Sequence, residues 1–342
     1  MEISTVDATR IIFTSTACLA TFLNITIIFA TIWRTKELTS TSLITFWLCC
    51  FDGLVASVDF TINVSTLTLH HVIDSTTFQT HTLSSTICQI HGLLHIFGGS
   101  SSLLLCLLLT TFRYSVIIQK HILSRKRTIT YIALAITAAA TFAGLPFILH
   151  APEIYILHPS QEYCATDWSQ QGPKPRVVVF INIMTVIPPV SFIGYAYYKM
   201  YQNVSKQCRK ASEVVRNARL HAEMKGRTGS DTEFESSYVS QNNQGTSSET
   251  VVNVPEYSRG LEKEAEEEER RLLKQSVIIV SAFLIGWSPY LLVMVYEATT
   301  TTLVPPIYDF LAIFCTVLNQ AINPMIVITY NSEIRNNLIF WK

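Results

Sequence analysis

The chain has 342 residues, of which 49% are hydrophobic and only 15% are charged, and its formal net charge at pH 7 is zero. A soluble domain of this length would need far more charge to cover its surface, so the composition excludes an ordinary water-soluble globular protein. The sequence instead predicts an all-α protein that crosses a membrane.

Seven apolar segments recur along the chain, and each is close to the ~20 residues that a membrane helix needs. We expect helices at about 11–33, 42–65, 86–118, 128–150, 176–203, 271–297 and 306–330. Lysine and arginine concentrate in the loops after the first, third and fifth helices and are missing from those after the second and sixth. Basic loops stay in the cytosol, which predicts a multi-pass protein of the cell membrane with an extracellular N-terminus.

Each of the first two helices carries a polar side chain deep in its apolar run. Asn24 lies in the first helix, and Asp52 lies near the midpoint of the second. A carboxylate in mid-membrane costs about 2.5–3.5 kcal/mol even on insertion scales, so Asp52 suggests a functional site. The alternative is a hydrogen bond that packs two helices together.

The third helix begins at Cys88 and runs past Arg113, 25 residues later. At 1.5 Å per residue this separation is about 37 Å, which puts the cysteine at the outer face and the arginine at the inner face. His91 and His95 lie between them on one helix face, with Ser102 deeper. Two histidines at this spacing can ligate zinc. Without a third ligand they more often line a polar cavity, so we expect no metal here.

The eight cysteines divide by location, and five of them lie inside the predicted helices. Cys88 and Cys164, which follows the fourth helix, are the one pair on the oxidising outer side. We therefore predict a disulfide between them.

Prolines lie inside the last three helices, at Pro188 and Pro189, at Pro289 and at Pro324. A proline removes a backbone donor and bends the helix, so Pro289 and Pro324 are places where a helix could pivot.

Two segments lie outside the predicted membrane helices. Residues 204–265 form a long third cytoplasmic loop that is basic, then rich in Ser, Asn and Gln and partly disordered, then charged and helical again. Its flanks are either soluble helix extensions or a docking surface with a phosphorylatable linker. Residues 332–341 predict a short amphipathic helix on the inner membrane surface.

Two pairs of residues have separations that matter for the comparison with known families. Asn24 and Asp52 are 28 residues apart, and Cys88 and Arg113 are 25 residues apart. Later in the chain come Tyr114, Tyr197, Phe283, Trp287, Pro289, Asn323 and Pro324. This set and its spacing resemble the rhodopsin-like, or class A, family of G-protein-coupled receptors over essentially the whole chain. The resemblance implies a single seven-helix receptor domain over residues 1–342, with Arg113, Tyr114, Tyr197, Phe283, Pro289 and Pro324 in its activation switch.

Within that family the chain looks most like the opsins, through AFLIGWSPY in the sixth helix and YCATDW around Cys164. Opsins hold retinal through a lysine six residues before the seventh-helix Asn-Pro asparagine, and here that position is Val317. Only an amine forms the Schiff base, so no covalent retinal is expected. His91 also stands where vertebrate visual opsins carry an acidic counterion. The pattern is similar to the lysine-lacking opsin relatives called placopsins.

The chain departs from the family's pattern at its inner end. Phe112 replaces the acid that normally precedes the third-helix arginine, and Val327 replaces the seventh-helix tyrosine. Glu269 stands 20 residues before Pro289, where the family has an acid in the sixth helix. An Arg113–Glu269 pair could still clamp these two helices, although two independently solvated charges are the alternative, because exposed ion pairs are weak.

The resemblance also implies an internal sodium pocket beneath Trp287, built from Asp52, Ser102, Asn319 and Asn323. Hard oxygen ligands around one carboxylate suit a small cation, and an ion that favours the inactive shape opposes activation.

We therefore expect a receptor, not an enzyme, that carries an extracellular or intramembrane ligand signal to a heterotrimeric G protein. The ligand pocket is expected at His91, His95, Trp287, Tyr290 and Val317. Arrestin is a second expected partner, with membrane lipid around the helices, an unknown small ligand and no nucleic acid. Ligand binding near Trp287 would favour a bend at Pro289 that parts Glu269 from Arg113.

Two other functions compete with this interpretation. His91 and His95 motivate a zinc-dependent seven-helix membrane hydrolase. A photoreceptor that holds retinal without a covalent bond is the second alternative, although retinal is not expected.

Overall fold

The computed structural model describes residues 5–34, 38–72, 85–121, 123–228, 254–330 and 334–335. The chain divides into two compact units, one formed by Met1–Tyr197 with Arg271–Lys342 and the other by Tyr198–Arg270. The first unit contains nearly all of the membrane bundle. In its described part, the second unit consists of helical segments 198–228 and 254–270.

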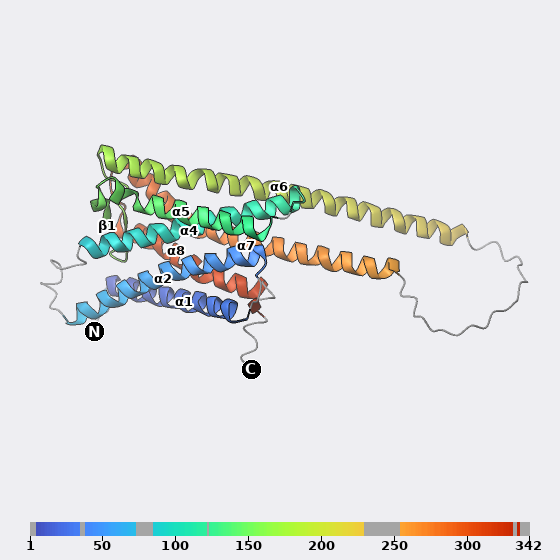
Figure 1. Ribbon diagram of the computed structural model, residues 1–342, viewed down its shortest axis with the longest axis horizontal. Helices are drawn as coiled ribbons and strands as arrows, with labels where there is room; N and C mark the ends of the chain where they lie inside the picture. Colours follow the sequence, from blue (N-terminus) through green and yellow to red (C-terminus); the bar gives the residue numbers. More distant parts are fainter. Residues whose placement is uncertain are drawn as a thin grey trace, which may run out of the picture. The chain divides into compact units, whose positions relative to one another are not determined.

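Seven long helices make up nearly all of the described chain (Figure 1). Each contains a stretch that is long and apolar enough to cross a membrane, from 24 residues in the shortest to 33 in the longest. Their bounds are α1 Thr5–Arg34, α2 Ser40–Val72, α4 Ser85–Ile118, α5 Arg125–Ile148, α6 Pro173–Thr228, α7 Val254–Thr300 and α8 Pro306–Tyr330. The predicted all-α, seven-helix fold class is confirmed.

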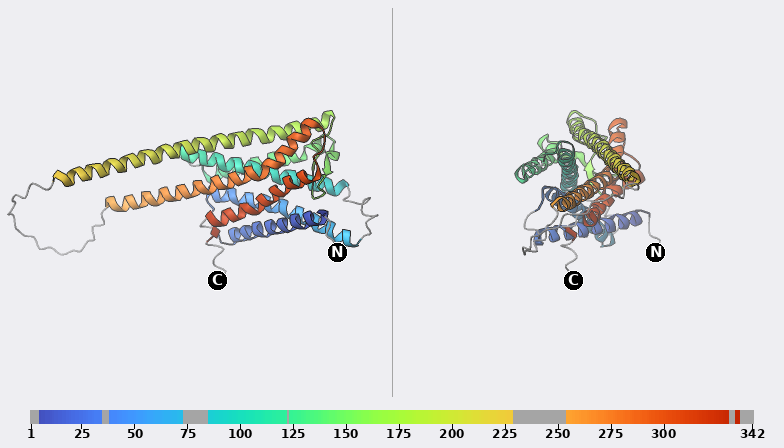
Figure 2. Two further views of the ribbon diagram at one scale, coloured as in Figure 1. Left: turned by 180° about the vertical axis from the view of Figure 1, so that it is seen from behind. Right: turned by 90° about the vertical axis from the view of Figure 1, so that its right-hand side faces the viewer.

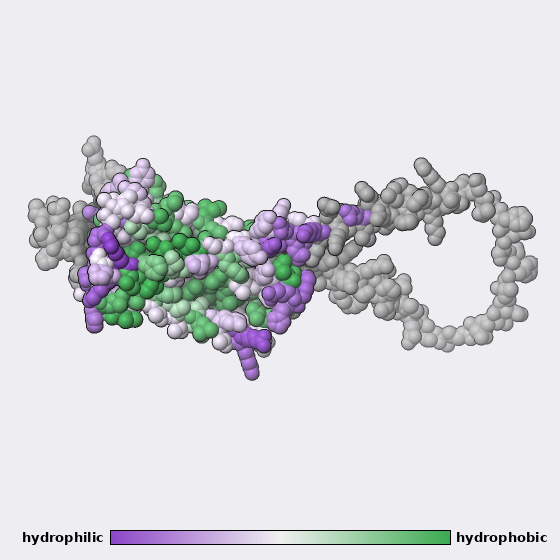
Figure 3. All heavy atoms as spheres, turned by 90° about the horizontal axis from the view of Figure 1, so that it is seen from above, coloured by the Kyte–Doolittle hydropathy of each residue, from purple (hydrophilic) through white to green (hydrophobic). Residues whose placement is uncertain are grey.

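The outer surface of the bundle is apolar where lipid would lie. Large hydrophobic side chains such as Phe22, Phe29, Ile285 and Leu292 are more than 60% exposed. Figure 3 shows the corresponding hydrophobic band over the middle of one face, with hydrophilic residues gathered toward its ends. In water such a patch would be unstable, whereas in a bilayer it contacts hydrocarbon.

Inside the bundle, small residues let the helices approach closely. α1 packs against α2 and α8, α2 against α4, and α4 against α5, as the two views in Figure 2 allow the reader to follow. A Cβ atom on Gly98 of α4 would lie 2.0 Å from Val55 Cγ2 of α2. A Cβ atom on Gly286 of α7 would lie 2.6 Å from Asn319 Cβ of α8. Any side chain at either glycine would push its two helices apart.

A small β-hairpin covers one end of the bundle, called here the hairpin end. It follows the short 3-10 turn Pro152–Ile154 and consists of β1 Tyr155–Leu157 and β2 Cys164–Thr166, paired antiparallel with Leu157 opposite Cys164. The disulfide Cys88–Cys164 ties β2 to the start of α4, which confirms the predicted pairing. Arg113 lies near the other end of α4, so the disulfide and the arginine are at opposite ends of this helix.

Prolines interrupt the backbone bonding of the last three helices at the predicted places. Pro188 and Pro189 lie inside α6, Pro289 inside α7 and Pro324 inside α8. Pro146 adds a further interruption near the end of α5.

Two predicted segments fall largely outside the described residues. In the third loop predicted at 204–265, α6 continues to Thr228 and α7 begins at Val254, and the residues between them are not described. Of the amphipathic helix predicted at 332–341, only residues 334–335 are described, and both are helical.

Candidate functional site

A mainly apolar cavity lies among α4, α6, α7 and the residues just after the hairpin. Its empty volume is about 640 Å³, including space open to the surroundings. Trp168 lines it from the hairpin side, and the polar groups that line it include His95, Asn182 and Tyr290. A pocket of this size and lining suits a small molecule with few polar groups.

Trp287 borders this cavity next to a residue that has no side chain. A Cβ atom on Gly99 of α4 would lie 2.5 Å from Trp287 Cη2, so the glycine makes room for the indole ring. Trp287 stacks on Phe283 at 5.6 Å between ring centres and meets Tyr290 edge-on at 5.9 Å. A ligand in the cavity would therefore touch an aromatic column that runs along α7 towards the interior.

Three of the five predicted pocket residues line this cavity, and two do not. His95, Trp287 and Tyr290 are in its wall. Val317 is fully buried in the apolar core near the hairpin end. His91 is also buried, but its ring is engaged by α2 and the hairpin.

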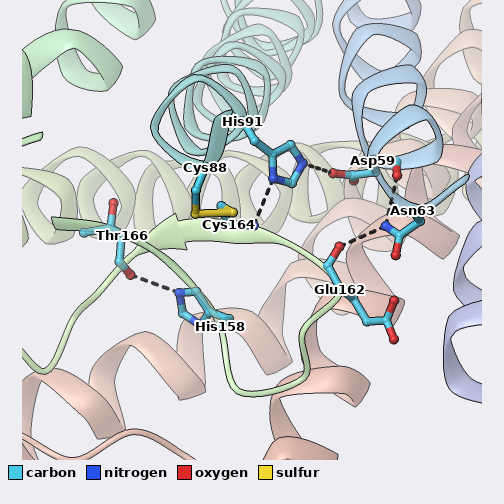
Figure 4. Close-up of a disulfide and its surroundings, with 8 residues drawn as sticks. All are labelled: Asp59, Asn63, Cys88, His91, His158, Glu162, Cys164 and Thr166. Carbon is cyan, nitrogen blue, oxygen red and sulfur yellow. Dashed lines mark hydrogen bonds and ion pairs between the residues drawn. A yellow bond between two sulfur atoms is a disulfide. The ribbon is translucent and has the colours of Figure 1, made fainter. Parts of the chain in front are cut away.

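His91 connects a buried carboxylate of α2 to the hairpin (Figure 4). Its Nε2 lies 2.9 Å from Asp59 Oδ1, and its Nδ1 accepts a 2.9 Å hydrogen bond from the backbone N–H of Cys164. Because Nδ1 accepts, the ring proton is on Nε2 and is donated to Asp59. His95 Nδ1 lies 3.5 Å from the same carboxylate oxygen.

A second connection joins the hairpin to α1 and α2. The Asn63 side chain donates to the backbone oxygens of Asp59 at 3.0 Å and Glu162 at 2.9 Å. The Glu162 carboxylate lies 3.7 Å from the Arg10 guanidinium of α1. Burial raises the pKa of Glu162 to about 7, although the charge of Arg10 acts to lower it.

A third connection joins the hairpin to α8 through Asp309. Tyr163 Oη donates to Asp309 Oδ1 at 2.7 Å, and the backbone N–H of Ser160 donates to Oδ2 at 3.0 Å. His158 Nδ1 lies 3.3 Å from Oδ1 of the same carboxylate, and both side chains are fully buried.

The contacts of His158 indicate a doubly protonated ring. Its Nε2 lies 3.2 Å from the backbone oxygen of Thr166, which can only accept, so Nε2 carries a proton. Its Nδ1 faces the Asp309 carboxylate and needs a second proton for that contact to be favourable. Burial lowers the pKa of His158, but the adjacent Asp309 carboxylate and the charge of Glu297 outweigh it and raise the pKa overall.

Deeper in the bundle, Asp52 joins α2 to α4 and α8. Ser102 Oγ donates to Asp52 Oδ1 at 2.7 Å, and Asn323 Nδ2 donates to Oδ2 at 2.8 Å. The side-chain oxygens of Asn319 and Asn323 are buried and have no hydrogen-bond partner among the described residues. Asn323 is bonded directly to the Asp52 carboxylate and keeps its own amide oxygen uncommitted, and oxygen ligands of this kind suit a small hard cation such as sodium.

The opposite end of the bundle holds the third-helix arginine. Arg113 and the preceding Phe112 are both buried, and Phe112 packs in the apolar core. The ring of Tyr114 lies 6.5 Å from that of a phenylalanine in α6, and Tyr197 packs against the same core as Phe112. The side chain of Glu269 is outside the described part of the chain, so its pairing with Arg113 stays a prediction.

Comparison with known families identifies the protein family to which the chain belongs. The profile of the family described as "7 transmembrane receptor (rhodopsin family)" matches residues 23–327. The chain belongs to the rhodopsin family of seven-transmembrane receptors. Comparison with the curated proteins finds no significant match.

A solved structure agrees with this family at the level of the fold. The crystal structure of squid rhodopsin superposes on the receptor with a TM-score of 0.73. The alignment covers 100% of this chain and 87% of the squid rhodopsin chain. The two sequences are 18% identical, so the likeness describes the fold and not the ligand.

From the sequence of this receptor we did not single out Asp59, whose carboxylate contacts His91 and His95. It lies seven residues after Asp52 in α2, and seven residues are two turns of a helix, so both carboxylates share one face. The rule that singled out Asp52, an acid within a membrane helix, applies equally to Asp59. Asp309 was missed in the same way at the beginning of α8.

Proposed function

We propose that this receptor transmits the binding of a small, mainly apolar ligand in its cavity to a heterotrimeric G protein. The hairpin end faces outside the cell, and the Arg113 end faces the cytosol. The observation that carries the proposal is the position of Trp287, which borders the cavity and stacks on Phe283 within a helix that Pro289 interrupts. Ligand contact at one end of this column can therefore change the bend of α7.

The polar cluster around Asp52 supports the same mechanism. It connects α2, α4 and α8 through two direct hydrogen bonds, so it favours one arrangement of these helices. A sodium ion held by the Asp52 carboxylate with Asn319 and Asn323 would favour the inactive arrangement and oppose activation. Arrestin would bind at the same cytosolic end as the G protein.

A cell-based G-protein activation assay tests the proposal. Wild-type receptor and Arg113→Ala are compared without ligand and with added retinal, at matched surface expression. Arg113→Ala should abolish activation, because the buried guanidinium lies where the G protein would engage. The matched control is Arg127→Ala, an exposed basic residue at the start of α5, which should signal like wild type. Equal signalling by wild type and Arg113→Ala would overturn the proposal.

The same assay separates a chemoreceptor from a receptor that binds retinal without a covalent bond. Val317 stands at the lysine position of opsins, so no Schiff base forms there. The largely apolar cavity is the observation that favours non-covalent binding. An absorption band that appears above the protein's own when retinal is added would support it. A chemoreceptor would show no such band.

A further inference from the structure

The Asp59 carboxylate is buried, with an exposed fraction of 0%, and one of its two oxygens, Oδ2, lacks a hydrogen-bond partner among the described residues. The adjacent His95 is 1% exposed, and neither of its ring nitrogens has a hydrogen-bond partner in the described chain. Buried polar atoms are almost always paired, and a buried anion with one neutral donor needs a further positive charge nearby.

The atoms that lack partners converge with His91 on one point. One nitrogen from each of His91 and His95 and one oxygen of Asp59 lie within 4.8 Å of one another. The separations to Asp59 Oδ1 are 2.9 Å from His91 Nε2 and 3.5 Å from His95 Nδ1. Ligand atoms bound tetrahedrally at zinc distances lie roughly 3.4 Å apart, so little movement would bring all three around one ion.

We propose that Asp59, His91 and His95 form a binding site for a divalent transition-metal ion, with Zn²⁺ as the ion that fits best. Imidazole nitrogens and a carboxylate oxygen are ligands that zinc accepts, whereas Mg²⁺ and Ca²⁺ prefer oxygen alone. The sequence offered two of the three ligands at helical spacing, and the fold supplies the third from α2.

The site borders the ligand cavity through one of its members. His95 lines the cavity, whereas Asp59 and His91 lie behind it. An ion would reach the site from the cavity, and a fourth ligand, either water or a ligand atom, would complete the coordination from that side.

Coordination would also change the attachment of the hairpin. In the apo arrangement His91 Nδ1 accepts the Cys164 N–H, so the ring proton is on Nε2. A metal on Nε2 requires that proton to leave while Nδ1 takes one up, with no net release of protons. The Nδ1–H would then face the Cys164 N–H. Because both groups are donors, they cannot bond to each other, and β2 would have to shift. Zinc binding therefore loosens this connection between α4 and the hairpin.

Zinc uptake by the purified full-length receptor tests the site directly, and it does not depend on the proposed signalling function. Receptor in lipid nanodiscs is stripped with a chelator, and Zn²⁺ binding is measured by competition with a chromophoric chelator. We expect one ion per chain. Co²⁺ should give the intense visible absorption of a tetrahedral site. Absence of stoichiometric uptake by wild-type receptor would overturn the proposal.

Three variants locate the bound ion. Asp59→Asn and His95→Gln keep the size of each side chain and should each weaken Zn²⁺ binding by more than about 100-fold, beyond the 10–100-fold typical of residues behind the ligands. The matched control is His150→Asn, an exposed histidine outside the cluster with φ of 52°, which asparagine tolerates. It should bind like wild type. Wild-type affinity in both cluster variants would overturn the assignment even when zinc binds.

Hydrogen exchange tests the predicted effect on the hairpin. Zn²⁺ should speed exchange of the Cys164 amide, because it removes the hydrogen bond to His91 Nδ1. The neighbouring Ser160 amide, which is bonded to Asp309, serves as the internal reference and should be unaffected. Unchanged exchange at Cys164 in zinc-loaded receptor would overturn the coupling between the ion and the hairpin.

Discussion

The buried pair His158–Asp309 should make the stability of the receptor fall as the pH rises above neutral. The perturbation is His158→Gln, which removes the titrating group and keeps a side-chain donor of similar length. In the wild type, His158 donates to the Thr166 carbonyl oxygen and faces the Asp309 carboxylate. The Thr166 contact needs a proton on Nε2 and the Asp309 contact needs a second one on Nδ1, so the two are favourable together only while the ring carries both protons.

The sign and the pH window follow from the direction of the pKa shift. The pKa of His158 is raised in the folded receptor, because the interactions with Asp309 and Glu297 outweigh the effect of burial. Its stabilising contribution is therefore complete below the unfolded value of about 6.5 and is lost as the pH rises through the folded value. One proton changes the free energy of unfolding by at most about 1.4 kcal/mol per pH unit.

Glu162 titrates in a different window and can be separated from His158. Burial raises the pKa of Glu162 from 4.5 to about 7, so its ionisation lowers stability mainly between those values, and its slope fades by about pH 8. The part of the slope above about pH 8 that is lost in His158→Gln therefore belongs to His158. Breaking a buried ion pair costs about 3–5 kcal/mol, and we expect the lower end because Asp309 keeps the Tyr163 and Ser160 donors.

The assay is thermal unfolding in nanodiscs at a fixed scan rate, at pH 6, 7, 8 and 9. Wild type should lose apparent Tm from pH 7 to 9, whereas His158→Gln, Asp309→Asn and the double variant should show a much smaller slope between pH 8 and 9. The two single changes should also be non-additive, since the residues share one contact. The same pH slope in His158→Gln as in wild type would refute the reasoning.

Four other changes give results that are simple to measure. Gly99→Ala places a Cβ atom 2.5 Å from Trp287 Cη2, so the indole must shift, and ligand-free G-protein signalling should rise; no change would mean that this contact does not control activity. Cys88→Ser removes a bridge spanning 76 residues and should lower the free energy of unfolding by about 4 kcal/mol, seen as a lower Tm. Phe112→Glu restores the missing acid and should reduce ligand-free signalling, and an unchanged level would contradict that hypothesis. Asp52→Asn should abolish any rise of Tm with added sodium compared with potassium, and a retained sodium effect would place the ion elsewhere.

The membrane helices could be predicted because their signal is local. A run of about 20 apolar residues between polar loops predicts a crossing whatever the rest of the chain does. The disulfide could also be predicted, since Cys88 and Cys164 were the one pair expected on the oxidising side.

The polar clusters were harder to predict because they depend on which helix faces meet. Asp59 and His91 are 32 residues apart in sequence, and His158 and Asp309 belong to a loop and a distant helix. The sequence around either residue of a pair does not indicate which residue is its partner. The hydrophobic pattern predicts that a helix is buried on one side, but not the rotation that points His91 at Asp59 and leaves Val317 in the apolar core.

The hairpin is attached to four different helices. Arg10 of α1, Asn63 of α2, the disulfide of α4 and Asp309 of α8 each hold it at a separate point. A lid secured in this way cannot swing on one hinge, because opening it breaks several buried polar contacts at once. We therefore expect any ligand that must pass the hairpin to exchange slowly with the aqueous phase.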